Sequence, residues 1–103
     1  KGNRVMGNSI KSAQFLIESR MARAASGSAE ACFDLGVAYS CGTGDMPIDL
    51  IEAHKWFNLA ALGGSEEGQA MRAEIAEEMT AREIAEAQRQ ARAWIALTQA
   101  RAA

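Results

Sequence analysis

The sequence predicts an all-α protein, a short α-solenoid of about five antiparallel helices arranged as hairpins, and three observations support this class. First, alanine makes up about a fifth of the 103 residues, whereas Val and Thr are scarce and proline occurs once, and this composition favours helix over strand. Second, apolar residues recur at intervals of three and four, the period of a helix with one buried face. Third, glycines and helix-capping residues divide the chain into segments of helical length.

The first two helices are predicted from their ends and their apolar stripes. The first covers residues 9–25, and the second runs from near Ser28 to Gly42, a glycine at a position where many helices end. The first buried face is expected to consist of Ile10, Ala13, Ile17, Met21 and Ala24. The second is expected to consist of Cys32, Leu35, Gly36 and Tyr39.

The third helix is expected to begin after the break at Pro47, with Asp49 as its cap and Glu52 completing a capping box. Two glycines end it, and its expected buried face consists of Ala53, Trp56, Phe57, Ala60 and Ala61. A glycine in a helix interior costs about 1 kcal/mol relative to alanine. Because Gly36 carries this cost, we expect a close approach of the third helix there, at the small pair Ala60 and Ala61.

The last two helices follow from two further caps. Ser65 begins the fourth helix, and a second capping box from Thr80 to Glu83 separates it from the fifth at Met79–Thr80. The expected inward residues of the fourth helix are Ala70 or Met71, Ala73, Ile75 and Met79. Those of the fifth are Ile84, Ala87, Ala91, Trp94 and Thr98. We expect the fifth helix to lie over the fourth as a C-terminal capping helix.

Two strings in the middle of the chain carry a family resemblance. They read A-x-x-x-L-G-x-x-Y-x-x-G-x-G from Ala31 to Gly44, and D-x-x-x-A-x-x-W-x-x-x-A-A-x-x-G from Asp49 to Gly64. Together they resemble the Sel-1-like repeat, a relative of the tetratricopeptide repeat. The stretch between the strings is one residue longer than is usual in the family, with Met46 expected at the apolar position. We expect one domain over residues 1–103, with a clear repeat at 29–64 and degenerate flanks at 9–28 and 65–103.

The resemblance implies a non-catalytic protein–protein interaction or adaptor module, the role generally given to such proteins in bacterial signalling, envelope and secretion-linked complexes and in eukaryotic quality control. With a net charge of −2 and a pI of about 5.4, the chain lacks the basic footprint of a nucleic-acid-binding protein. No apolar stretch approaches the roughly 20 residues of a membrane-spanning helix. We therefore expect neither nucleic acid nor membrane as partner. We expect a cytoplasmic location, and a periplasmic one stays open because the chain starts with Lys1 rather than Met.

Four apolar residues fall outside the predicted stripes and are the candidate partner-binding residues: Phe33 and Val37 on the second helix, and Ile95 and Leu97 on the fifth. The charge is distributed unevenly, with a balance of +4 in residues 1–26, −8 in residues 27–79 and +2 in residues 80–103. The acidic centre favours a protein partner with a basic segment, and an ordinary solvated face is the alternative. Ile95 and Leu97 could also support a weak homodimer.

The alternative function is a thiol- or metal-dependent ligand-binding protein or enzyme that uses Cys32, Cys41 and His54. A zinc site normally has four N or S ligands at short paired spacings, and no such pairs occur in the sequence. On one helix the two cysteines would lie roughly 13 Å apart, too far for a disulfide. The sequence therefore predicts free thiols, no catalytic residue, no cofactor and no metal site.

Overall fold

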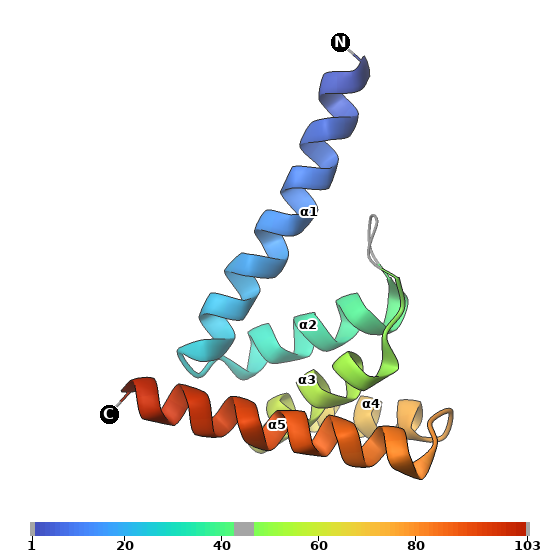
Figure 1. The fold of residues 1–103 in the computed structure, drawn as a ribbon, viewed down its shortest axis with the longest axis vertical. Helices are drawn as coiled ribbons and strands as arrows, with labels where there is room; N and C mark the ends of the chain where they lie inside the picture. Colours follow the sequence, from blue (N-terminus) through green and yellow to red (C-terminus); the bar gives the residue numbers. More distant parts are fainter. Residues whose placement is uncertain (1, 43–46, 103) are drawn as a thin grey trace.

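The computed structural model describes residues 2–42 and 47–102, and the side chains of residues 14–42 and 47–100. Every regular element in that part of the chain is a helix (Figure 1). The elements are α1 (Gly2–Ala25), α2 (Ala29–Cys41), α3 (Leu50–Leu62), α4 (Glu66–Ala76) and α5 (Ala81–Ala102). The prediction of an all-α chain of about five helices is confirmed. The expectation for Met46 falls outside the described residues.

Side-chain caps begin the helices where the sequence predicts them. The side chains of Ser28, Asp49 and Ser65 each accept a hydrogen bond from the backbone N–H three residues further on. The second capping box is reciprocal, because the Glu83 carboxylate accepts from the N–H of Thr80 and the Thr80 hydroxyl accepts from the N–H of Glu83. These bonds satisfy backbone donors that a helix start leaves unpaired.

The first capping box is only half formed, which corrects the expectation for Glu52. The Glu52 carboxylate accepts a hydrogen bond from the indole N–H of Trp56 at 3.1 Å and forms an ion pair with Lys55 at 2.9 Å. The N–H of Asp49 donates instead to the carbonyl of Tyr39. Glu52 therefore anchors a buried indole and does not close the box.

α1 begins at Gly2 and not near residue 9, so the predicted start of the first helix is wrong. The early residues contain no proline that would stop the helix. Its expected inner residues Ile17, Met21 and Ala24 do face the core, while Ile10 and Ala13 lie outside the described side chains. α1 packs chiefly against α2, and its N-terminal half extends away from the other four helices (Figure 1).

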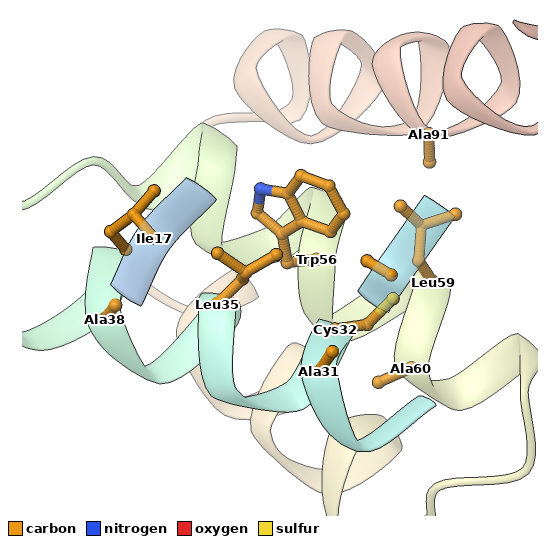
Figure 2. Packing of buried hydrophobic residues seen from close by; sticks show 10 residues of the cluster. Ile17, Ala31, Cys32, Leu35, Ala38, Trp56, Leu59, Ala60 and Ala91 are labelled. Atoms are coloured by element: carbon orange, nitrogen blue, oxygen red, sulfur yellow. The ribbon is translucent and has the colours of Figure 1, made fainter. Parts of the chain in front are cut away.

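The α2–α3 hairpin is the centre of the molecule, and each of its faces is covered by other helices. On one face, residues of α1 and α5 complete the larger core cluster, and Figure 2 shows Trp56 at its centre, between Leu35 of α2 and α5. On the other face, α4 contributes Ile75 to a second cluster with Ala53 and Phe57. α3 therefore has α2, α4 and α5 around it, which explains why Leu59 and His54 are also buried, beyond the predicted face.

α5 packs against α3 and not over α4, which corrects the expected position of the capping helix. Its predicted stripe is right, since Ala87 and Ala91 are buried and the Trp94 ring meets the Trp56 ring edge-on, with centroids 4.9 Å apart. α3 covers the inner face of α4. On α4, Met71 and Ile75 face inward, whereas Ala73 is exposed, contrary to expectation, because it is off the three- and four-residue spacing of that face.

Gly36 does mark a close approach, although its neighbour differs from the expected one. A Cβ atom built on Gly36 would lie 2.5 Å from Cδ1 and 2.6 Å from Cε1 of Phe57, a fully buried ring. Ala60 instead meets α4, where a Cβ on Gly68 would lie 2.9 Å from the Ala60 Cβ. The α2–α3 hairpin is therefore closely packed because the Phe57 ring lies directly against the backbone of α2 at Gly36.

Candidate functional site

A groove of about 290 Å³ lies where the N-terminal ends of α2 and α4 meet, and we call it the acidic groove. Phe33 supplies its aromatic surface, with the ring half-buried and tilted at 55° to the Phe57 ring, 5.5 Å between centroids. Glu30 and Glu67 are exposed at its rim. The groove is lined by Ala29, Glu30, Phe33, Gly63, Gly64, Ser65 and Glu67.

The turn between α3 and α4 builds one wall of the acidic groove. Gly64 has a positive φ of 100°, a left-handed conformation that glycine adopts without steric cost. Gly63 lies directly against the start of α2, since a Cβ on it would be 2.9 Å from the Cβ of Ala29. Ser65 then caps α4. A larger residue at position 63 would push the turn away from α2 and open this wall.

The charge of the acidic groove comes from the first turns of two helices. Glu30 lies in the first turn of α2, and Glu66 and Glu67 lie in the first turn of α4, where the helix dipole favours a carboxylate. None of the described residues that line the groove is basic. Arg23 reaches Glu30 with an N–O distance of 3.1 Å, but both side chains are largely exposed, so this ion pair contributes little and can exchange.

The structure separates the four predicted partner-binding residues. Phe33 lines the acidic groove, whereas Val37, one turn further along α2, is half-buried against the second core cluster. Ile95 lines another groove, of about 290 Å³, between the end of α1 and the C-terminal half of α5. Leu97 is 54% exposed and borders a hollow of about 240 Å³ beside Lys55.

The groove that contains Ile95 adjoins the acidic groove, and we call it the tryptophan groove. Both grooves include Ala29 and Gly63, so the contact between these two residues forms their common wall. Sequence reasoning missed Leu62, which is 66% exposed at the edge of the tryptophan groove. Its position directly before the glycine pair is the signal that it lies at the end of a hairpin. The tryptophan groove is lined by Ala24, Gly27, Ser28, Ala29, Cys32, Leu59, Leu62, Gly63, Trp94, Ile95, Thr98 and Gln99.

The residues of the alternative function lie in different environments. Cys32 is buried, which raises the pKa of its thiol to about 11, so it is protonated at neutral pH and a poor nucleophile. Cys41 is exposed at the C-terminal end of α2. His54 is 3% exposed, and burial together with the positive charge of Arg72 lowers its pKa. Within residues 2–42 and 47–102, no three His, Cys, Asp or Glu side chains are grouped so that they could hold a metal ion.

None of the described helices combines the length and the apolar character needed to cross a membrane.

A comparison with protein-family models matches residues 29–65 to the Sel1 repeat. Comparisons with curated proteins and with solved structures give no match to this chain. The matched residues begin at the first residue of α2 and end at Ser65, the cap of α4, so they comprise the α2–α3 hairpin and its closing turn. The resemblance expected from the Leu-Gly, Tyr and Trp positions is thereby confirmed. Residues 29–65 are thus similar to a Sel1 repeat, and they are flanked by α1 on one side and by α4 and α5 on the other.

Proposed function

We propose that this protein is a non-catalytic protein–protein interaction module that binds a segment of its partner at the acidic groove. Sel1 repeats generally mediate contacts between proteins. The observation that carries the proposal is the combination of an accessible aromatic ring, Phe33, with the carboxylates of Glu30 and Glu67 at one groove. Such a groove suits a segment with one large apolar side chain and neighbouring lysine or arginine residues.

The two kinds of contact have different roles in this proposal. An apolar side chain in the groove covers Phe33 and removes both surfaces from water, which supplies affinity. Exposed carboxylates attract a basic segment and accelerate its association, and this contribution falls as salt is added. A segment longer than the acidic groove crosses the common wall at Ala29 and Gly63 and reaches Leu62 and Ile95.

Three observations support a non-catalytic role over the thiol- or metal-dependent alternative. The Cys32 thiol has its pKa raised by burial, which opposes the thiolate form. Cys41 is exposed at the C-terminal end of α2, so the two thiols lie in different environments. His54 faces the Arg72 side of the hairpin, whereas Cys32 belongs to the cluster covered by α1 and α5.

A phage-displayed library of random peptides tests the proposed function. We expect the wild-type protein to select peptides that place lysine or arginine next to a large apolar residue, and binding should weaken as salt is raised. The variant Glu30→Lys/Glu67→Lys should no longer select them. Glu77→Lys/Glu78→Lys makes the same change in net charge at the far end of α4, and it should keep the selection. Peptides without basic residues, or the same peptides from the groove variant, would contradict the proposal.

Substitutions in α5 test whether the binding surface continues into the tryptophan groove. Ile95→Glu should weaken the binding of long selected peptides, because Ile95 lines the adjoining groove. Leu97→Glu is its matched control, since Leu97 borders a separate hollow beside Lys55. Equal effects of the two substitutions would place the second contact outside the tryptophan groove.

A further inference from the structure

We propose that Arg23 is an internal competitor for the acidic groove: its guanidinium occupies the Glu30 carboxylate in the free protein and has to leave when a basic residue of the partner binds there. The inference rests on the proposed function, because it concerns how the same groove selects its partner. Three features of the molecule carry it: the contact between Arg23 and Glu30, the turn that holds Arg23 beside the groove, and the difference between Glu30 and Glu67.

The contact places a basic side chain of the protein on the rim of its own groove. Nη2 of Arg23 donates a hydrogen bond to Oε1 of Glu30 at 3.1 Å, and Glu30 lines the acidic groove. The two side chains are 51% and 79% exposed, so the pair is open to water and to other cations. Ion pairs of this kind are weak and exchange readily. A lysine or arginine of the partner makes the same kind of contact with Glu30, so the two cations compete for it on similar terms.

The turn between α1 and α2 keeps this competitor in place. The carbonyl of Arg23 accepts hydrogen bonds from the backbone N–H groups of Ser26 and Ser28 and from the Ser26 hydroxyl. Gly27 lies between the two serines with a positive φ of 105°, a conformation common where a helix ends. These bonds fix the backbone of Arg23 and leave its side chain free to turn away. Because the backbone is fixed, the guanidinium stays beside Glu30 at a high effective concentration.

The two carboxylates of the acidic groove consequently differ in what they offer a partner. Glu67 is exposed in the first turn of α4, and no described basic side chain forms an ion pair with it. A basic residue that binds at Glu67 therefore adds an ion pair. A basic residue that binds at Glu30 replaces one ion pair by another and gains little. Arg23 thus makes Glu67 the main source of charge-dependent affinity, and it disfavours segments whose basic residues reach Glu30 alone.

A double-mutant cycle measured by fluorescence anisotropy tests this competition. The probe is a labelled basic peptide that the wild-type protein selects from the phage library. Arg23→Gln should bind it about two- to fivefold more tightly, because the competitor is gone. The bonds of the turn go to the backbone of Arg23, so this substitution keeps them. Glu67→Gln should weaken binding more than Glu30→Gln does.

Two controls separate the competition from a general change in charge. In the Glu30→Gln background, Arg23→Gln should bring no further tightening, because the carboxylate for which the two cations compete is absent. Arg82→Gln makes the same change in net charge at the start of α5, where Arg82 is exposed, and it should leave the affinity unchanged. Equal tightening by Arg82→Gln, or tightening by Arg23→Gln that persists without the Glu30 carboxylate, would overturn the competition.

The same measurements distinguish a failure of this inference from a failure of the proposed function. An unchanged affinity in Arg23→Gln, with binding still lost in Glu30→Lys/Glu67→Lys, would mean that the groove binds basic segments without an internal competitor. That result overturns the inference and leaves the proposed function standing. A wild-type protein that selects no basic peptides would overturn both.

Discussion

At the scale of single residues, bare backbone at one position determines how closely the central hairpin packs. Gly36 lets the Phe57 ring rest on α2, and the ring has no exposed surface through which it could move aside. The sequence indicated the close approach through the cost of a mid-helix glycine, yet it could not identify the neighbour. Phe57 and Ala60 both lie on the predicted inner face of α3, and only the geometry of the crossing decides between them.

Gly36→Ala should destabilise the protein even though alanine favours helix. The gain in helix propensity is at most about 1 kcal/mol, whereas overpacking against a buried ring typically costs about 1–3 kcal/mol. Gly36→Leu should cost considerably more. Urea unfolding measures the difference, and Phe57→Leu provides the control, because the cost of Gly36→Ala should shrink in that background. An unchanged cost in the Phe57→Leu background would show that the ring is not the obstacle.

His54 should make stability depend on pH just below neutrality. Burial, and then the charge of Arg72, lower its pKa from the ordinary value of 6.5. The unfolded chain therefore takes up a proton at a higher pH than the folded chain does, so stability is complete above pH 6.5 and falls as the pH drops toward the folded pKa. The urea midpoint should be lower at about pH 5.5 than at about pH 7.5.

The control for this pH dependence is His54→Gln, which removes the only histidine of the chain. Its urea midpoint should change much less between the same two pH values, because carboxylates titrate mostly at lower pH. An equally steep dependence in His54→Gln would assign the effect to other groups. The Nδ1 atom of His54 is buried without a hydrogen-bond partner in the described part of the chain.

At the scale of helices, sequence reasoning found the elements more reliably than their neighbours. Local signals such as the Ser65 cap and the Thr80–Glu83 box act within one turn, and the structure has them where the sequence predicts them. The sequence also predicted the buried stripe of α5 correctly. It did not show which helix α5 packs against, because an amphipathic pattern identifies the buried face of a helix and not the surface that this face contacts.

The candidate site shows the same limit. Phe33 could be found from the sequence because it is a large apolar residue off the stripe of its helix. The groove around it depends on the contact between Ala29 and Gly63, which are 34 positions apart in the chain. No pattern along the chain reports such a contact. Leu62 was missed for the same reason, since its exposure depends on how the α3–α4 turn is placed.

Removing α5 should expose α3, and tryptophan fluorescence can report it. A chain that ends after Thr80 keeps Trp56 as its only tryptophan, without the Trp94 ring that covers it at 4.9 Å. We expect its emission to shift to longer wavelength relative to full-length Trp94→Phe, which also has Trp56 alone. Its stability should fall as well, because α5 buries Ala87 and Ala91. Matching emission spectra would mean that α5 does not shield Trp56.

At the scale of the whole molecule, the charge and the shape divide the chain in the same way. The basic N-terminal region lies in α1, and the acidic region lies largely in residues 29–65 and α4. α1 supplies Ile17 and Ala24 to the larger core cluster from its C-terminal half, while α3 is surrounded by three other helices. Local stability should therefore decrease steeply from the centre of the molecule to the N-terminal half of α1.

Amide hydrogen exchange should reveal this gradient. We expect the slowest exchange in α3, which has three helices around it, and the fastest helical exchange in the N-terminal half of α1, which extends away from the other helices (Figure 1). Uniform protection along α1 in the dilute wild type would contradict the expected gradient.

The wall shared by the two grooves has a consequence for the order in which they arise as the chain folds. The acidic groove is made entirely from residues 29–67, and it is complete once α2, α3 and the start of α4 have come together. The tryptophan groove joins Ala24 to Trp94 and Thr98, positions some 70 residues apart, so it requires a much longer loop to close. A chain emerging from the ribosome therefore presents its acidic groove first and acquires the second groove only when α5 docks. Any ligand that needs both grooves distinguishes a finished molecule from one still being made.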